Sequence, residues 1–216
     1  MTEPSNAEME SRSWPWFEVW QKALLKPSPS TYKNMLNRGK PSLSKAFLWM
    51  TLSSIAAAFF SAISQNIYLS WLQRMTDLDL ALPVFARGVL TYLCGVPAAA
   101  LSILIGFAFW VGMILLVSRL FGGQGSYTDM SFLFASFHAP LGIVTGLLSL
   151  IPLINCLNVF LGFYGLVLAV IAIRVVTDVD TGKAILILLT PLLVIGLILG
   201  CLILGILVFF IPVTQQ

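Results

Sequence analysis

Four long tracts without any charged residue dominate this sequence. They lie between Lys45 and Arg74, between Arg87 and Arg119, between Asp129 and Arg174, and from Lys183 to the end of the chain. Each is long enough to cross a bilayer, because about 20 apolar residues in a helix span about 30 Å of hydrocarbon. Charged residues make up only 10% of the chain, against about 25% in soluble domains. The sequence therefore excludes a water-soluble globule and predicts a polytopic membrane protein.

The number of spans follows from the length of the tracts. As one helix, residues 130–173 would be about 66 Å long, twice the bilayer core, and Pro152 and Asn155 supply turn residues near the middle. We therefore predict an all-α fold, a polytopic integral membrane bundle of five transmembrane helices. The predicted spans are residues 46–71, 97–120, 130–151, 157–176 and 184–211, which together form one transmembrane domain over residues 46–211.

The basic residues predict the orientation of this bundle. In a five-span topology, ten of the twelve Lys and Arg residues share one face of the membrane, and only Arg74 and Arg87 lie on the other. Since Lys and Arg are retained on the cytoplasmic side during insertion, we expect a cytoplasmic N-terminus and a C-terminus outside. The ten are Arg12, Lys22, Lys26, Lys33, Arg38, Lys40, Lys45, Arg119, Arg174 and Lys183.

The segment before the first span divides into two parts. Residues 1–13 are polar and predicted to be disordered, whereas residues 14–45 are rich in aromatic and basic side chains. We expect the second part to lie on the membrane as a cytoplasmic interfacial amphipathic segment, facing anionic headgroups. Its lipid-facing residues would be Trp16, Phe17, Trp20, Lys22 and Lys26. At the other end of the chain, residues 212–216 form a short external tail.

His138 and Pro140 are the candidate residues within the membrane. His138 is the only histidine, and an ionisable group inside a span is a functional suspect. However, all nine acidic residues lie outside the spans, so a neutral, hydrogen-bonded packing role is favoured over a proton relay. Pro140 removes a backbone donor from the same helix and predicts a kink, as Pro191 does in the last span.

Two polar connections supply the other candidate functional or structural residues. Gly122, Gly123 and Gly125 predict a flexible connection between the second and third spans. Before the last span come Arg174, Asp178, Asp180, Gly182 and Lys183. The spacing of Asp178, Asp180 and Gly182 is similar to the start of a calcium-binding loop, but Leu189 occupies the position of the bidentate Glu ligand. We interpret this segment as a helix–helix turn in which Asp180 or Thr181 caps the last helix, with Arg174 and Lys183 at the headgroups.

Small residues repeat at helical spacing in three spans, which allows helices to approach closely in lipid. The pairs Gly142 with Gly146 and Gly196 with Gly200 are each four residues apart, and Ser54, Ala58 and Ser61 form a third face. We expect these faces to pack within the chain, with homodimerisation as the alternative. The three cysteines lie far apart and are expected to be buried free thiols.

No arrangement of residues predicts catalysis. The sequence contains no nucleophile elbow, no zinc-protease motif, no phosphate-binding loop and no paired carboxylates within the membrane. We therefore expect no enzymatic activity, no cofactor and no metal site. The basic residues flank membrane spans rather than alternating with aromatics on a soluble face, so nucleic acid is not an expected partner.

The order of these elements resembles the Yip family of five-span membrane proteins, of the prokaryotic type. The resemblance rests on the aromatic segment Trp14 to Lys26, the run Gly122 to Tyr127 before a span with Ala135 to Pro140, and Thr181 to Ala184 before the last span. Eukaryotic members interact with Rab-type small GTPases in vesicle traffic. Their N-terminal Asp-Leu-Tyr-Gly-Pro type motif is absent here, so a small GTPase partner is not supported by the N-terminal sequence.

Two hypotheses for function follow. The first is a non-enzymatic integral membrane protein that serves as a membrane scaffold, or in membrane organisation or trafficking, in contact with the bilayer and its anionic headgroups and with membrane-protein partners or further copies of itself. The alternative is a small transporter or channel component with a path near His138 and Pro140. The expected location is a prokaryotic cytoplasmic (inner) membrane, as a multi-pass integral protein.

Overall fold

The computed structural model describes residues 14–76, 91–151 and 154–210. This part of the chain is helical and contains five helices long and apolar enough to cross a membrane, as predicted. In chain order the elements are α2 (Trp16–Leu25), α3 (Pro29–Arg38), α4 (Leu43–Thr76), the π-helical turn η1 (Thr91–Gly95), α6 (Val96–Leu120), α7 (Tyr127–Ser149), α8 (Leu157–Thr177) and α9 (Thr181–Phe210). The predicted N-terminal tail, Pro152 and the external tail lie outside the described residues.

Local signals set the helix ends. α4 begins at Leu43, before the predicted start at residue 46, and the backbone N–H of Lys45 donates to Ser42 Oγ (3.2 Å) in its first turn. In the same way, the N–H of Asp129 donates to Ser126 Oγ (3.0 Å) at the start of α7. These capping bonds satisfy backbone donors that would otherwise have no partner at a helix start.

α7 is the central helix of the bundle. It packs against α4, α6 and α8, and its N-terminal part also contacts α2 and α3. Every residue from Met130 to Phe137 is fully buried. A helix that is apolar all round belongs in a core, and the aromatic residues of α7 form that core together with Trp49 of α4 and Ile114 of α6.

The glycines of α7 permit close contact with α4. A Cβ atom on Gly142 would lie 2.6 Å from Ser53 Oγ, and one on Gly146 would lie 3.1 Å from Ala57 Cα. Ser53 also donates to the carbonyl of Ala139 across this contact (2.7 Å). The prediction of a small-residue packing face at Gly142 and Gly146 is therefore confirmed.

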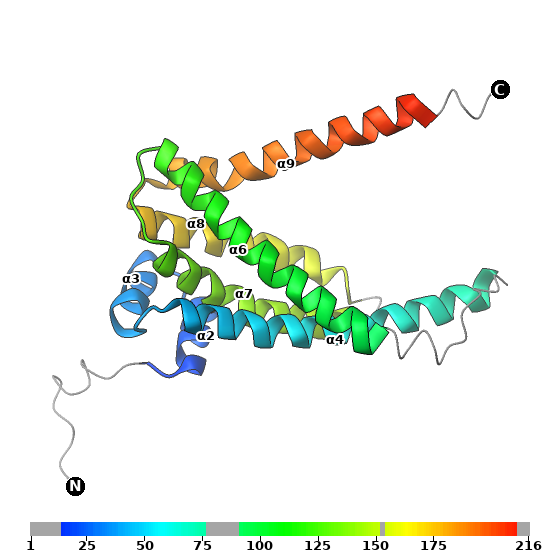
Figure 1. Ribbon diagram of the computed structural model, residues 1–216. Coiled ribbons are helices and arrows are strands. Elements are labelled where there is room, and N and C mark those ends of the chain that lie inside the picture. Colours follow the sequence, from blue (N-terminus) through cyan, green and yellow to red (C-terminus); the bar gives the residue numbers. More distant parts are fainter. Residues whose placement is uncertain (1–13, 77–90, 152–153, 211–216) are drawn as a thin grey trace, which may run out of the picture.

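α9 contacts α6 and α8 only along its first part and then diverges from the other helices (Figure 1). Ile187 is fully buried, whereas every residue from Leu192 to Leu199 is exposed. A Cβ atom on Gly196 or Gly200 would meet nothing within 4 Å, so the predicted packing face is not used among the residues that the structure describes. None of the three cysteines is in a disulfide, as predicted, but all three are exposed rather than buried.

Basic residues gather at one end of the bundle, where α2 and α3 lie across the ends of the spans (Figure 1). We call this the basic end. It comprises α2, α3, residues 39–45, the connection 121–126, the turn 178–180, and the turns of α6, α8 and α9 that adjoin these connections. Among the described residues it carries Lys22, Lys26, Lys33, Arg38, Lys40, Lys45, Arg119, Arg174 and Lys183.

Candidate functional site

The N-terminal helices α2 and α3 are docked on the bundle by tyrosine hydroxyls. Tyr164 of α8 donates a hydrogen bond from its hydroxyl to the carbonyl of Leu24, near the end of α2. Tyr32 of α3 is fully buried, and its hydroxyl donates to the carbonyl of Ala23 (3.4 Å). Burial, with a smaller contribution from Tyr164, raises the pKa of Tyr32 above its ordinary value. The two helices are thus part of the folded core at the basic end.

Aromatic rings form the rest of this interface. The ring of Trp49 lies 6.0 Å from that of Trp20 and 5.2 Å from that of Phe132. The indole N–H groups of Trp20 and Trp49 are buried without an acceptor among the described residues. Such groups cost stability, so aromatic packing rather than hydrogen bonding of the indoles holds α2 in place.

α2 has apolar residues on both of its sides. Val19 and Ala23 are buried against the protein, whereas Phe17 is 75% exposed and Leu25 71% exposed. Trp16 is also exposed, and so is Lys26. Lys22 pairs with Glu18 (2.6 Å) and lies over the ring of Trp14. The rings of Trp16 and Trp20 both lie edge-on to that of Trp49, at 6.3 and 6.0 Å. The predicted contact of the lipid-facing set with lipid stays a prediction; the set is Trp16, Phe17, Trp20, Lys22 and Lys26.

The connection between α6 and α7 is tightly packed, in contrast to the flexible connection that we predicted. A Cβ atom on Gly125 would lie 2.8 Å from Val176 Cγ1, and one on Gly123 would lie 3.0 Å from Thr177 Cβ. The N–H of Gln124 donates to the carbonyl of Thr177 (3.1 Å). Gly122 has φ = 79°, a conformation that favours glycine. These glycines let the connection lie against the end of α8.

The turn between α8 and α9 has the predicted capping arrangement. Asp180 Oδ2 accepts from the backbone N–H of Lys183 (3.2 Å), which caps the start of α9. Asp178 is left-handed, with φ = 53°, a conformation that Asp and Asn adopt more readily than most residues. Gly182 follows in the first turn of α9, where a Cβ atom would approach Asp180 Oδ2 to 3.1 Å.

Four of the charged side chains at the basic end line one cavity of about 320 Å³. Lys33 comes from α3, Arg174 from the last turn of α8, and Asp178 and Asp180 from the turn that follows. Three of them were candidates from the sequence, whereas Lys33 was not. The sequence alone could not predict that Lys33 and Arg174 line the same cavity, because they are far apart in the chain and are brought together by the packing of α3 on α8.

His138 and Pro140 lie in the middle of α7 and away from the basic end. The Nδ1 atom of His138 hydrogen-bonds to the carbonyl of Phe134 (3.1 Å), and its ring stacks on that of Phe134 and lies tilted against that of Phe137. Because a carbonyl only accepts, Nδ1 carries the proton in a neutral ring and Nε2 is left as an acceptor. Pro140 is buried. Phe134 and Phe137 support the packing role that was favoured for His138.

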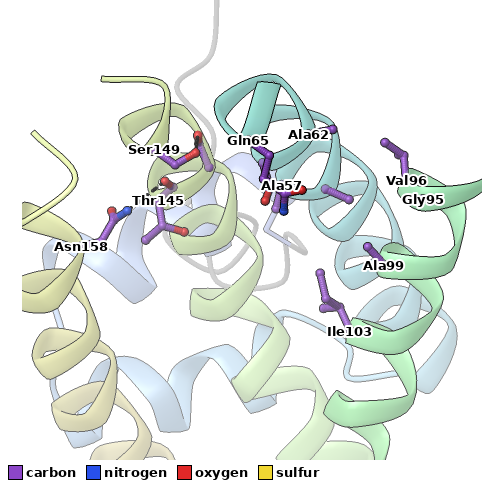
Figure 2. Close-up of a pocket in the computed structure, with 13 residues that line it drawn as sticks. Ala57, Ala62, Gln65, Gly95, Val96, Ala99, Ile103, Thr145, Ser149 and Asn158 are labelled. Carbon is purple, nitrogen blue, oxygen red and sulfur yellow. Dashed lines mark hydrogen bonds between the residues drawn. The ribbon is translucent and has the colours of Figure 1, made fainter. Parts of the chain in front are cut away.

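Two cavities flank α7, one at mid-depth and one toward the end opposite the basic end. One of about 330 Å³ lies at mid-depth, since it is lined by His138, by Trp110 of α6 and by Leu188 of α9, eight residues into a helix that starts at the basic end. The second, of about 370 Å³, lies between α4, α6 and α7 (Figure 2) and is lined by Gln65 and Ser149 among others. Thr145 and Asn158 line both. On the basic side of His138, the residues Met130, Phe132 and Leu133 are fully buried.

One comparison with known proteins gives a match. A family model, the Yip1 domain, matches residues 22–211. Neither the curated proteins nor the solved structures contain a match. The matched region includes α3, all five candidate spans and the last four residues of α2.

Proposed function

The chain belongs to the Yip1 domain family, and on this basis we propose that it is a non-enzymatic membrane scaffold that presents the basic end to the cytoplasm. The observation that carries the proposal is the docking of α2 and α3 across the bundle through Tyr164, Tyr32 and Trp49. This docking holds α2 and α3 beside the connection 121–126 and the turn 178–180, so that the basic end forms one fixed surface. A fixed surface of this kind suits the binding and arrangement of neighbouring membrane components.

The proposed orientation is supported by charge. Nine basic residues among the described part of the chain lie at the basic end, and cytoplasmic ends of membrane proteins carry such an excess. A reporter that is active only outside the cytoplasm should be active when fused after Gln216 and inactive when fused before Met1. The same activity from both fusions would refute the orientation. The membrane we propose is a prokaryotic cytoplasmic membrane.

The scaffold role is tested with the full chain in its native membrane. A photoreactive amino acid at Phe17 or Leu25, both exposed at the basic end, should crosslink to a neighbouring membrane protein or to a second copy. The matched control is Leu101, which is exposed in the first half of α6, away from the basic end, and should crosslink mainly to lipid. Equal protein crosslinking at all three positions would contradict a partner surface at the basic end. No feature of the basic end supports a small GTPase as that partner.

A transporter or channel component is the second candidate, and the two cavities that share Thr145 and Asn158 favour it. One is lined by Ser149 at the end opposite α2, and the other by His138. Against it stands the packed layer of Met130, Phe132 and Leu133, which would have to open for a solute to pass. In reconstituted vesicles we expect no ion or solute flux. A flux that His138→Ala abolishes would favour the transporter instead.

A further inference from the structure

The cavity at the basic end has an unusual charge distribution for a surface hollow. Its four charged side chains are two cations, Lys33 and Arg174, and two anions, Asp178 and Asp180. All four side chains are exposed. Within residues 14–76, 91–151 and 154–210 the structure has an ion pair at Lys22 and Glu18 and none between these four. Their charged groups therefore keep hydrogen-bonding capacity for a ligand that enters the cavity.

The position of the cavity defines the depth of that ligand. Arg174 lies in the last turn of α8, and Asp178 and Asp180 follow before α9 begins. Both helices are candidate spans, so the turn between them lies at the level of the lipid headgroups. α3 covers the turn from the side, with Pro29, Ser30 and Lys33 on the cavity. A headgroup of the surrounding leaflet can therefore reach the charges without leaving the membrane.

We propose that this cavity binds the headgroup of one phospholipid that carries both a phosphate and a primary ammonium group, as in phosphatidylethanolamine. A volume of about 320 Å³ is within the range of small-molecule sites. The binding would join α3 to the α8–α9 turn, which are otherwise linked by side-chain packing. This goes beyond the scaffold role, since neither depends on the other.

Each half of the headgroup has matching partners. The guanidinium of Arg174 is suited to bidentate binding of a phosphate, and Lys33 adds a second cation. The N-terminus of α3, at Pro29 and Ser30, adds a favourable dipole. Asp178 and Asp180 accept hydrogen bonds from an ammonium group; Asp180 has the oxygen Oδ1 for this, since Oδ2 accepts from Lys183. A trimethylammonium group has no N–H to donate, so phosphatidylcholine should bind less well.

The test uses the full-length protein in nanodiscs of mixed phosphatidylethanolamine and phosphatidylcholine. Native mass spectrometry after gentle release should show one phosphatidylethanolamine retained per chain in preference to phosphatidylcholine. Arg174→Gln and Asp178→Asn each remove one charge-assisted contact and should reduce the retention about tenfold. Asn tolerates the left-handed conformation of residue 178, so this variant keeps the turn folded. Lys183→Gln and Lys26→Gln are matched controls outside the cavity and should retain the lipid.

The outcomes separate specific binding from general attraction. Equal retention of both lipids, or an equal loss in all four variants, would overturn the proposal. Anionic phosphatidylglycerol retained as well as phosphatidylethanolamine, with no effect of Asp178→Asn, would show attraction to basic residues alone and would also overturn it. Soluble glycerophosphoethanolamine tests the source of the headgroup. It should not displace the lipid at equal concentration, and displacement would overturn the assignment to a membrane lipid.

Discussion

The hydroxyl of Tyr164 in the fourth span donates to the carbonyl of Leu24 in α2, 140 residues earlier in the chain. This bond joins the segment before the first span to a helix in the second half of the bundle. Leu24 lies one residue before the end of α2, where helix carbonyls lack a partner within their own helix. The contact therefore completes α2 and fixes its position at the same time.

Tyr164→Phe should loosen α2 without unfolding the spans. The variant leaves the carbonyl of Leu24 without its donor, at a cost of about 1 kcal/mol. This corresponds to about fivefold faster amide exchange in α2, which hydrogen–deuterium exchange of the protein in nanodiscs would measure. Tyr68→Phe is the control, because Tyr68 is exposed near the C-terminal end of α4, away from α2. Unchanged exchange in Tyr164→Phe would show that the hydroxyl contributes nothing to docking.

Gly142→Ala should destabilise the contact between α4 and α7. The new Cβ atom would lie 2.6 Å from Ser53 Oγ, which must move and give up its bond to the carbonyl of Ala139. We expect a loss of about 1–3 kcal/mol, measured as a lower denaturant or thermal midpoint in detergent. Gly196→Ala adds the same atom where nothing lies within 4 Å and should not destabilise. Similar losses in both variants would refute close packing at Gly142.

Docking of α3 should weaken at alkaline pH. Burial raises the pKa of Tyr32 above the ordinary tyrosine value of about 10. Below that value both the docked and undocked forms are protonated, and the stability is fully present. Above it the undocked form loses its proton first, so stability falls by up to about 1.4 kcal/mol per pH unit. Amide exchange in α3 between pH 8 and 11 should show this loss.

Tyr32→Phe is the control for the alkaline effect. Lysines ionise in the same pH range, so the difference between the two proteins isolates Tyr32. The variant lacks the ionisable hydroxyl and should show the smaller dependence on pH. Parallel pH profiles would mean that Tyr32 does not report on docking.

Phe17 should be inserted among lipids, whereas Asn34 should face water. Phe17 is 75% exposed beside the ends of the spans, and an apolar side chain there gains free energy in the interface. Asn34 is exposed on α3. Spin labels at each position, in a protein whose three cysteines are replaced by alanine, would be compared for contact with oxygen and with a water-soluble nickel complex. Equal access of the nickel complex to both labels would contradict the interfacial position of α2.

Span number and close packing at Gly142 could be predicted because each depends on short-range sequence features. Uncharged tracts set the number of helices, and glycine spacing produced the α4–α7 contact. The same spacing at Gly196 and Gly200 has no packing partner within residues 14–76, 91–151 and 154–210. Small residues permit close approach, but another helix must be present to use it, and α9 diverges before Gly196.

The composition of the candidate site was less predictable. Amphipathicity assigned Trp20 to the lipid, but Trp20 packs on Trp49, because a hydrophobic pattern does not distinguish a lipid from a protein neighbour. Glycines in the connection at Gly123 and Gly125 suggested flexibility, although the same lack of side chains allows tight packing. Lys33 became a cavity residue through the docking of α3 on α8, a long-range contact for which the sequence contains no local signal.

The divergence of α9 gives this helix a mechanical freedom that the other spans lack. Its 30 residues extend about 45 Å at 1.5 Å per residue, which exceeds the roughly 30 Å of hydrocarbon. A helix that is too long for its bilayer tilts. Since every residue from Leu192 to Leu199 is exposed, we expect bilayer thinning to increase the inclination of α9 while the packed helices around α7 keep their arrangement. The last span would then respond to membrane thickness independently of the core.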